Sequence, residues 1–172
     1  MDVIVVILSA TASVFFLGLA EGVNEPAPNV ADTNGKFVVD DPDARDNQIV
    51  RITHIAGEGV AVEEIEIIVR ATGPSLGTTA RLVDLPVDDT TVDSKNIEGN
   101  TDLIDKGLAV QTIQEGDSNV WSVGRTIEFR VSTGEADFRI DENNTGPEAD
   151  KLELIIVHTP SNAIISEHTF RP

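Results

Sequence analysis

The chain begins with a run of uncharged, mostly apolar residues that differs from everything after it. Residues 3–20 read VIVVILSATASVFFLGLA, and Ser9, Thr11 and Ser13 are the polar side chains in this run. No face of a helix built from it would be polar. Eighteen helical residues extend about 27 Å, close to the roughly 30 Å hydrocarbon core of a bilayer. The pattern therefore predicts a long apolar helix over residues 1–22 that is buried in lipid or among copies of itself.

Three interpretations of this predicted helix compete. A cleaved secretory signal would fit the small residues Gly18 and Ala20, but the basic segment that begins such signals is missing. A single-pass membrane anchor fits the length, although no flanking Lys or Arg marks its orientation. The favoured interpretation is an assembly element in the core of a helical filament. Its packing residues would be Val3, Ile4, Val5, Val6, Ile7, Leu8, Val14, Phe15, Phe16, Leu17 and Leu19.

After residue 22 the pattern changes twice. Residues 23–35 contain two prolines and no apolar periodicity, which predicts an extended linker. From Lys36 onwards, short runs of apolar residues recur with a period of two, as in strands. The runs predicted as strands are 37–39, 48–55, 62–70, 80–85, 108–113, 125–132, 138–140, 151–159 and 163–170. These predict an antiparallel, immunoglobulin-like β-sandwich over residues 36–172, so that the fold class of the whole chain would be α+β.

The strongest local signal lies at the carboxyl end. Runs 151–159 and 163–170 are separated by three turn residues, which predicts a hairpin. The stretch 154–157 (LIIV) is apolar on both faces, so its strand is predicted to be central in the sheet. The exposed surface is then expected elsewhere, in residues 84–105 and in the loop 141–150.

Composition adds constraints on partners. The chain has 30 Asp and Glu against 12 Lys and Arg, a net charge of −18, so it repels nucleic acid and anionic headgroups. A hydrophobic content of 40% is too high for a disordered acidic tail. Acid-rich, lysine-poor surfaces are typical of salt-loving organisms, where salt screens repulsion to within about 3 Å at 1 M. The absence of cysteine excludes disulfides, thiol catalysis and thiolate metal sites.

Candidate catalytic or metal-binding residues are few. His158 and His168 fall on the predicted final hairpin, where they could lie close together, and His54 falls on an earlier strand. A metal site would need a further ligand, so local structural roles are favoured for all three. The acidic clusters Asp40–Asp43 and Asp88–Asp93 offer the oxygen ligands of Ca²⁺ without EF-hand spacing. With no nucleophile elbow or phosphate loop, we expect neither an enzyme nor a cofactor, metal or small-molecule substrate.

One modification signal is present. Asn143-Asn144-Thr145 is the only Asn-x-Ser/Thr acceptor in the chain, and it falls in a predicted polar loop. On an exported protein, glycosylation of Asn143 would add bulk and hydration to the outer surface.

Several phrases carry a family resemblance. They are FFLGLAEGV within the apolar run, the proline-containing linker after it, and ITH, GEG, VEEIEIIV, WSVG and IIVHTPSNAIISEHTF in the β region. Together they resemble an archaeal type IV pilin of the halophilic kind. The resemblance implies an extracellular filament at the cell surface, serving adhesion or cell contact. Copies of the chain would be the partners, membrane-inserted before assembly, with helices in the core and β domains outside. The alternative is a single-copy, membrane-anchored binding module.

Overall fold

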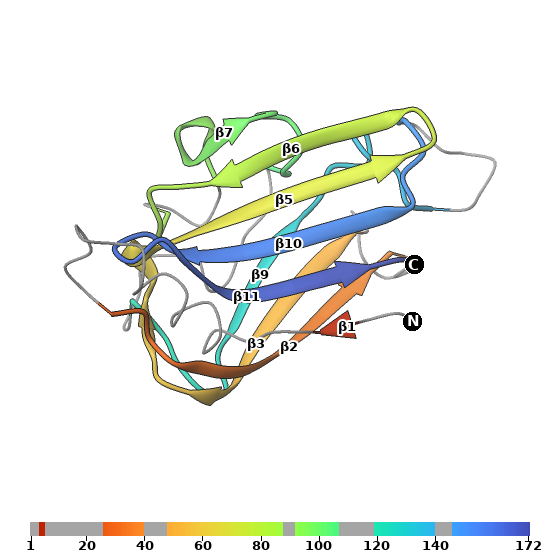
Figure 1. Cartoon of the computed structure of the whole chain (residues 1–172). Helices are drawn as coiled ribbons and strands as arrows, with labels where there is room; N and C mark the ends of the chain where they lie inside the picture. The colour runs from red at the N-terminus through yellow and green to blue at the C-terminus, as the bar shows by residue number, and fades with distance from the viewer. Residues whose placement is uncertain (1–3, 6–25, 40–47, 88–91, 107–118, 140–145) are drawn as a thin grey trace.

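Two β-sheets packed face to face form most of the described structure (Figure 1). The computed structural model describes residues 4–5, 26–39, 48–87, 92–106, 119–139 and 146–172. The large sheet has the strand order β1-β11-β10-β5-β6-β7, and all of its pairs are antiparallel. The small sheet has the order β2-β3-β9, also antiparallel. The described part of the chain is thus a β-sandwich-like fold.

The bounds of the elements are as follows. The large sheet contains β1 (Ile4–Val5), β5 (Ile65–Gly73), β6 (Leu76–Leu82), β7 (Ile97–Gly99), β10 (Lys151–His158) and β11 (Ala163–Phe170). The small sheet contains β2 (Val30–Val38), β3 (Ile49–Gly57) and β9 (Thr126–Arg130). The remaining elements are a ribbon of β4 (Val60–Ala61) with β8 (Val120–Trp121) and the 3₁₀ turns η1 (Val62–Glu64) and η2 (Ser94–Asn96).

The core lies between the two sheets and follows from the period-two pattern of the strands. In β10, Leu152, Leu154 and Ile156 are buried and alternate with half-buried residues such as Lys151 and Glu153. Strands β3, β5 and β9 alternate in the same way, because successive side chains point to opposite faces of a sheet. The largest fully buried side chains include Trp121, Phe129, Phe170, Leu82 and Leu103.

The prediction of an α+β fold with a long amino-terminal helix is wrong. The described residues contain no α-helix, and their helical turns are the short η1 and η2. Ile4 and Val5 instead form β1, antiparallel to β11. Both residues are β-branched, which favours a strand beside an available sheet edge. The other predicted assembly residues lie outside the described residues: Val3, Val6, Ile7, Leu8, Val14, Phe15, Phe16, Leu17 and Leu19.

Among the residues that the structure describes, no helix is both long enough and apolar enough to cross a membrane.

The carboxyl-terminal hairpin forms as predicted, and its first strand is central. β10 pairs with β11 on one side and with β5 on the other. The ladder shifts register in β11, because Ile156 pairs with Ser166 while Val157 pairs with Ile164. The neighbouring residues Ile165 and Ser166 are therefore both buried, and the simple alternation breaks at this bulge.

Two other regions differ from the expected pattern. β2 begins at Val30, within the range predicted as a linker, because its polar residues pair along the length of β3. The stretch 84–105 was expected to form exposed surface, but it contributes buried side chains to the core. Its apolar side chains at 4% exposure or less are Leu85, Val87, Val92, Ile97, Leu103 and Ile104. The predicted strand 108–113 lies outside the described residues.

Candidate functional site

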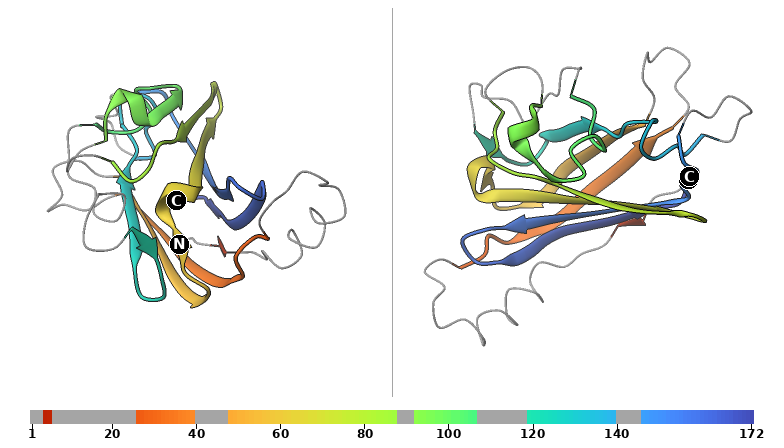
Figure 2. Two further views of the ribbon diagram at one scale, coloured as in Figure 1. Left: turned by 90° about the vertical axis from the view of Figure 1, so that its left-hand side faces the viewer. Right: turned by 90° about the horizontal axis from the view of Figure 1, so that it is seen from above.

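The most distinctive site is the seam where β2 of the small sheet meets β11 of the large sheet (Figure 1). β2 presents Thr33, Gly35 and Phe37 to the seam, and β11 presents Ser166, His168 and Phe170. Each set repeats every second residue, as expected for side chains on one face of a strand. Figure 2 shows the two strands from two further directions, close together over part of their length. We call these six residues the seam.

Three polar side chains bond to one another at the centre of the seam. The Thr33 hydroxyl lies 2.8 Å from the Ser166 hydroxyl and 2.9 Å from His168 Nε2. The Ser166 hydroxyl lies 3.1 Å from the same nitrogen. Because these groups are buried, each bond made here avoids the cost of an unsatisfied polar group. We call Thr33, Ser166 and His168 the polar triangle. Its hydrogen bonds link the two sheets through side chains rather than through a ladder of backbone hydrogen bonds.

The His168 ring packs against backbone and aromatic neighbours. A Cβ at Gly35 would lie 2.5 Å from His168 Nδ1, so glycine is required here for lack of space. The ring stacks on Phe170, with centroids 6.0 Å apart. Phe37 in turn contacts both Phe170 and Phe138. An aromatic cluster thus continues the seam beyond the polar triangle.

The Ser166–His168 pair has the residue types of a nucleophile and its base, but the geometry does not favour catalysis. Both side chains are only 1% exposed. His168 Nδ1, where an orienting carboxylate would bind, faces the Gly35 backbone and has no hydrogen-bond partner among the described residues. Ser166 and His168 instead stabilise the contact between the two sheets by bonding to Thr33.

Burial lowers the pKa of His168 from 6.5 to about 4, and the negative charge of Asp32 opposes part of this shift. The unfolded chain therefore binds a proton between about pH 6.5 and 4 that the folded chain excludes. Stability should fall as the pH is lowered through this window, by about 3 kcal/mol from this group alone.

We expect the free energy of unfolding of the wild type to drop more between pH 7 and pH 4.5 than that of His168→Gln. Glutamine keeps hydrogen-bonding capacity but does not titrate. The measurement is urea unfolding of both chains at several pH values and constant high salt. Carboxylates titrate in both proteins, so the difference between the two curves isolates His168. Parallel curves would show that His168 is not a buried neutral group.

The other two histidines are placed apart from the seam. In the β10–β11 ladder, His168 lies opposite Leu154, whereas His158 lies opposite Ala163 at the other end of the hairpin. The structure therefore does not bring His158 and His168 together. The described residues contain no group of three or more His, Asp or Glu side chains arranged to hold a metal ion.

His158 belongs to a turn. Its Nδ1 lies 2.7 Å from the Ser161 hydroxyl, and its Nε2 lies 3.3 Å from a Glu64 carboxylate oxygen. The same hydroxyl accepts the backbone N–H of Ala163. Ser161 and His158 are almost fully buried, so this Ser-His-Glu set closes the β10–β11 turn and links it to η1. His54 is local as well: its Nε2 lies 2.7 Å from the Glu58 carbonyl oxygen, and its ring packs edge-on against Trp121.

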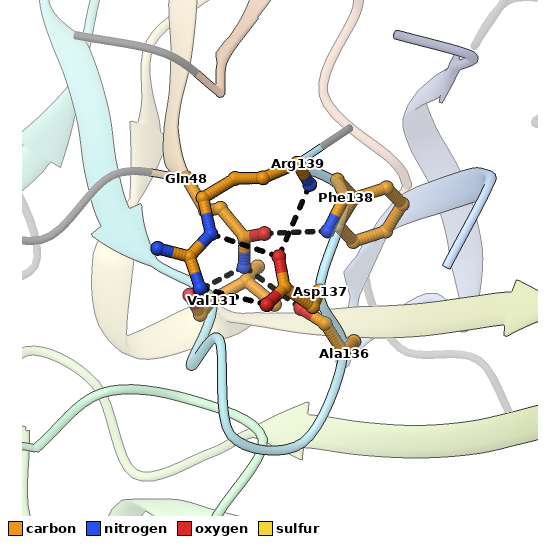
Figure 3. Close-up of polar contacts among 6 residues, drawn as sticks. All are labelled: Gln48, Val131, Ala136, Asp137, Phe138 and Arg139. Carbon is orange, nitrogen blue, oxygen red and sulfur yellow. Dashed lines mark hydrogen bonds and ion pairs between the residues drawn. The ribbon is translucent and has the colours of Figure 1, made fainter. Parts of the chain in front are cut away.

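A second buried polar centre surrounds Gln48, just before β3 (Figure 3). Its amide nitrogen donates to the carbonyl oxygens of Val131 and Ala136, at 3.0 and 2.8 Å. Its amide oxygen accepts the backbone N–H of Phe138 at 2.7 Å. Gln48 has a φ of 73°, uncommon for a residue with a side chain. It holds the segment after β9 against the small sheet.

The adjacent Asp137 and Arg139 side chains form a two-pronged ion pair. The carboxylate oxygens of Asp137 accept from Arg139 Nε and a terminal guanidinium nitrogen, at 2.9 and 2.7 Å. Asp137 also joins residues 147–149 through its backbone N–H and C=O. Sequence reasoning missed this centre and the seam. Ser166 and His168, on one face of the predicted strand 163–170, were a usable signal, whereas Thr33 lies in the range predicted as a linker.

The remaining sequence candidates are not brought together. Asp93 is at the start of η2, where it exchanges hydrogen bonds with Asn96. The rest of its acidic cluster, the cluster Asp40–Asp43 and the acceptor Asn143 lie outside the described residues.

The fold thus defines a β-sandwich-like protein with a seam closed by side chains. Comparison with protein-family models, with curated proteins and with solved structures found no match.

Proposed function

We propose that this chain is a structural subunit of an extracellular filament at the cell surface. Its apolar first segment joins copies of the chain, and its acidic β-sandwich forms the outer surface for adhesion or cell contact. Before assembly, the apolar segment resides in the membrane. The sequence phrases that resemble halophilic archaeal type IV pilins support this proposal, which does not depend on a helical filament core.

The observation that carries the proposal is the contrast between the sandwich core and the first twenty residues. The described core is built from residues between Val30 and Phe170, and their side chains fill the space between the sheets at 7% exposure or less. Residues 3–20 are uncharged and mostly apolar. Such a run is too large an apolar surface to leave in water. It is therefore available to bind lipid first and then other copies.

The test is the substitution Val14→Asp, with Thr79→Asp as the matched control. Val14 lies in the middle of the apolar run, whereas Thr79 is exposed on β6. An unpaired carboxylate among packed apolar residues costs several kcal/mol per subunit, so Val14→Asp should abolish fibres and Thr79→Asp should preserve them. Electron microscopy of sheared cell-surface material gives the readout.

Normal fibres from the Val14→Asp chain would contradict assembly through this segment. A wild-type chain that remains on the cell surface as dispersed single copies would instead favour a membrane-anchored binding module.

A further inference from the structure

The outer edge of β11 is a place where a strand can be added. Along its inner edge β11 pairs with β10 from Leu152 to His158. On its outer edge it pairs with β1, where Val5 lies opposite His168 and Ile4 opposite Thr169. Within the described residues, β1 is the one strand on that edge, and it covers two positions of an eight-residue strand. Unpaired backbone groups of an edge strand readily accept another chain.

β1 also contacts β2, so it lies at the seam between the two sheets (Figure 1). The seam is held by side-chain bonds among Thr33, Ser166 and His168 rather than by a ladder between β2 and β11. A strand at this place extends the large sheet by backbone hydrogen bonds and at the same time covers the seam. β1 therefore acts as a closing strand for the sandwich.

The connection between β1 and the rest of the chain is long. Residues 6–29, twenty-four in number, separate Val5 from the start of β2 at Val30. Such a length can extend up to about 80 Å, several times the width of a small domain. The same strand can thus reach the seam of its own domain or that of a neighbour, with identical contacts in each case. Exchange of an identical element between copies is a low-cost route to assembly.

We propose that in the assembled state the outer edge of β11 receives the first strand of a second copy of this chain, so that each subunit closes the seam of the next. This inference rests on the proposed filament function and specifies how its subunits are joined. The observed register places Ile4 opposite Thr169 and Val5 opposite His168. Both residues of this strand, Ile4 and Val5, are apolar, and successive residues of a strand point to opposite faces.

A second copy is favoured as the donor because of that two-sided apolar character. A strand at this edge has two faces, and in an isolated subunit the face turned away from the sandwich core is in contact with water. In a row of subunits the neighbouring domain covers the outer face. The donated strand and the accepting edge are different surfaces, so each contact leaves one donor and one acceptor free. Such head-to-tail contacts extend into a filament when they do not close into a ring.

Disulfide trapping tests this exchange directly, because the chain contains no cysteine of its own. Ile4 and Thr169 are opposite each other in the β1–β11 pair, at the separation of about 4.5–5.5 Å between Cα atoms that a disulfide can span. Full-length Ile4→Cys chains carrying a tag are assembled with untagged Thr169→Cys chains and then oxidised. The control mixture replaces Thr169→Cys with Glu98→Cys, which is exposed on β7 at the far edge of the same sheet.

We expect the tagged-to-untagged dimer to be at least tenfold more abundant with Thr169→Cys than with Glu98→Cys. We also expect the double variant Ile4→Cys/Thr169→Cys to form a ladder of covalent oligomers. Monomers with an internal disulfide in the double variant, together with no mixed dimer, would overturn the exchange and place the strand in its own domain.

Electron microscopy of the same samples separates this inference from the filament proposal. Normal fibres without mixed disulfides would refute strand exchange and leave the filament function standing. Mixed disulfides in closed dimers without fibres would support the exchange and refute the filament.

Discussion

Ending the chain at Asn162, and so removing β11, is expected to unfold the sandwich completely. β11 supplies the buried side chains of Ile165 and Phe170. It also supplies Ser166 and His168, which form hydrogen bonds with Thr33 of β2. Each large apolar side chain contributes about 1.5–3 kcal/mol, and the loss of β11 also strips hydrogen-bond partners from β10. The sum is comparable with a whole domain stability of about 5–15 kcal/mol.

The measurement is thermal melting of the full-length chain, followed by circular dichroism in a mild non-ionic detergent that covers the apolar segment. The matched control removes Arg171 and Pro172, which are exposed and follow β11. That shorter truncation should melt within a few degrees of the parent. A chain ending at Asn162 that still melts cooperatively at the parent temperature would show that β11 is peripheral.

Replacing Gln48 with leucine is expected to lower the free energy of unfolding by about 3 kcal/mol or more, because each buried polar group left without a hydrogen bond costs about 1–3 kcal/mol. Leucine has similar bulk but leaves the carbonyls of Val131 and Ala136 and the N–H of Phe138 without their partner. These three groups lie in one segment. The loss of their hydrogen bonds to Gln48 should therefore detach the chain between β9 and residue 139 before the two sheets separate.

Urea unfolding gives the magnitude, and amide hydrogen exchange at Phe138 gives the location. The control is Thr53→Val on β3, which removes one half-buried hydrogen bond to Thr126 and should cost about 1 kcal/mol or less. A Gln48→Leu chain as stable as the Thr53→Val chain, with a slowly exchanging Phe138 amide, would show that Gln48 does not hold this segment.

Much of the sandwich was predictable because apolar and polar residues alternate along its strands. Ile65, Ile67 and Val69 in β5, and Leu152, Leu154 and Ile156 in β10, have the period of two that a half-buried strand requires. The LIIV run indicated a central strand, and β10 lies between β11 and β5. These signals are local, because each depends on one strand having a buried and an exposed face.

The amino-terminal helix was wrongly predicted for a physical reason. Uniform hydrophobicity marks a segment as buried but does not specify its backbone conformation, and β-branched residues such as Ile4 and Val5 pair well at a sheet edge. Similarly, the polar stretch that became β2 has no apolar period, and it forms a strand because β3 supplies its hydrogen-bond partners.

The amino-acid sequence by itself determined the acidic surface, the absence of thiol chemistry, the alternating strands and the closing hairpin, because these depend on composition and on the near neighbours of each residue. Only the tertiary structure decided which polar residues would be buried. Thr33 meets Ser166 and His168 across more than 130 positions of sequence, and Gln48 bonds a segment more than 80 positions away. A buried polar group is stable only where it has a hydrogen-bond partner, and the packing of the two sheets determines which residues become partners.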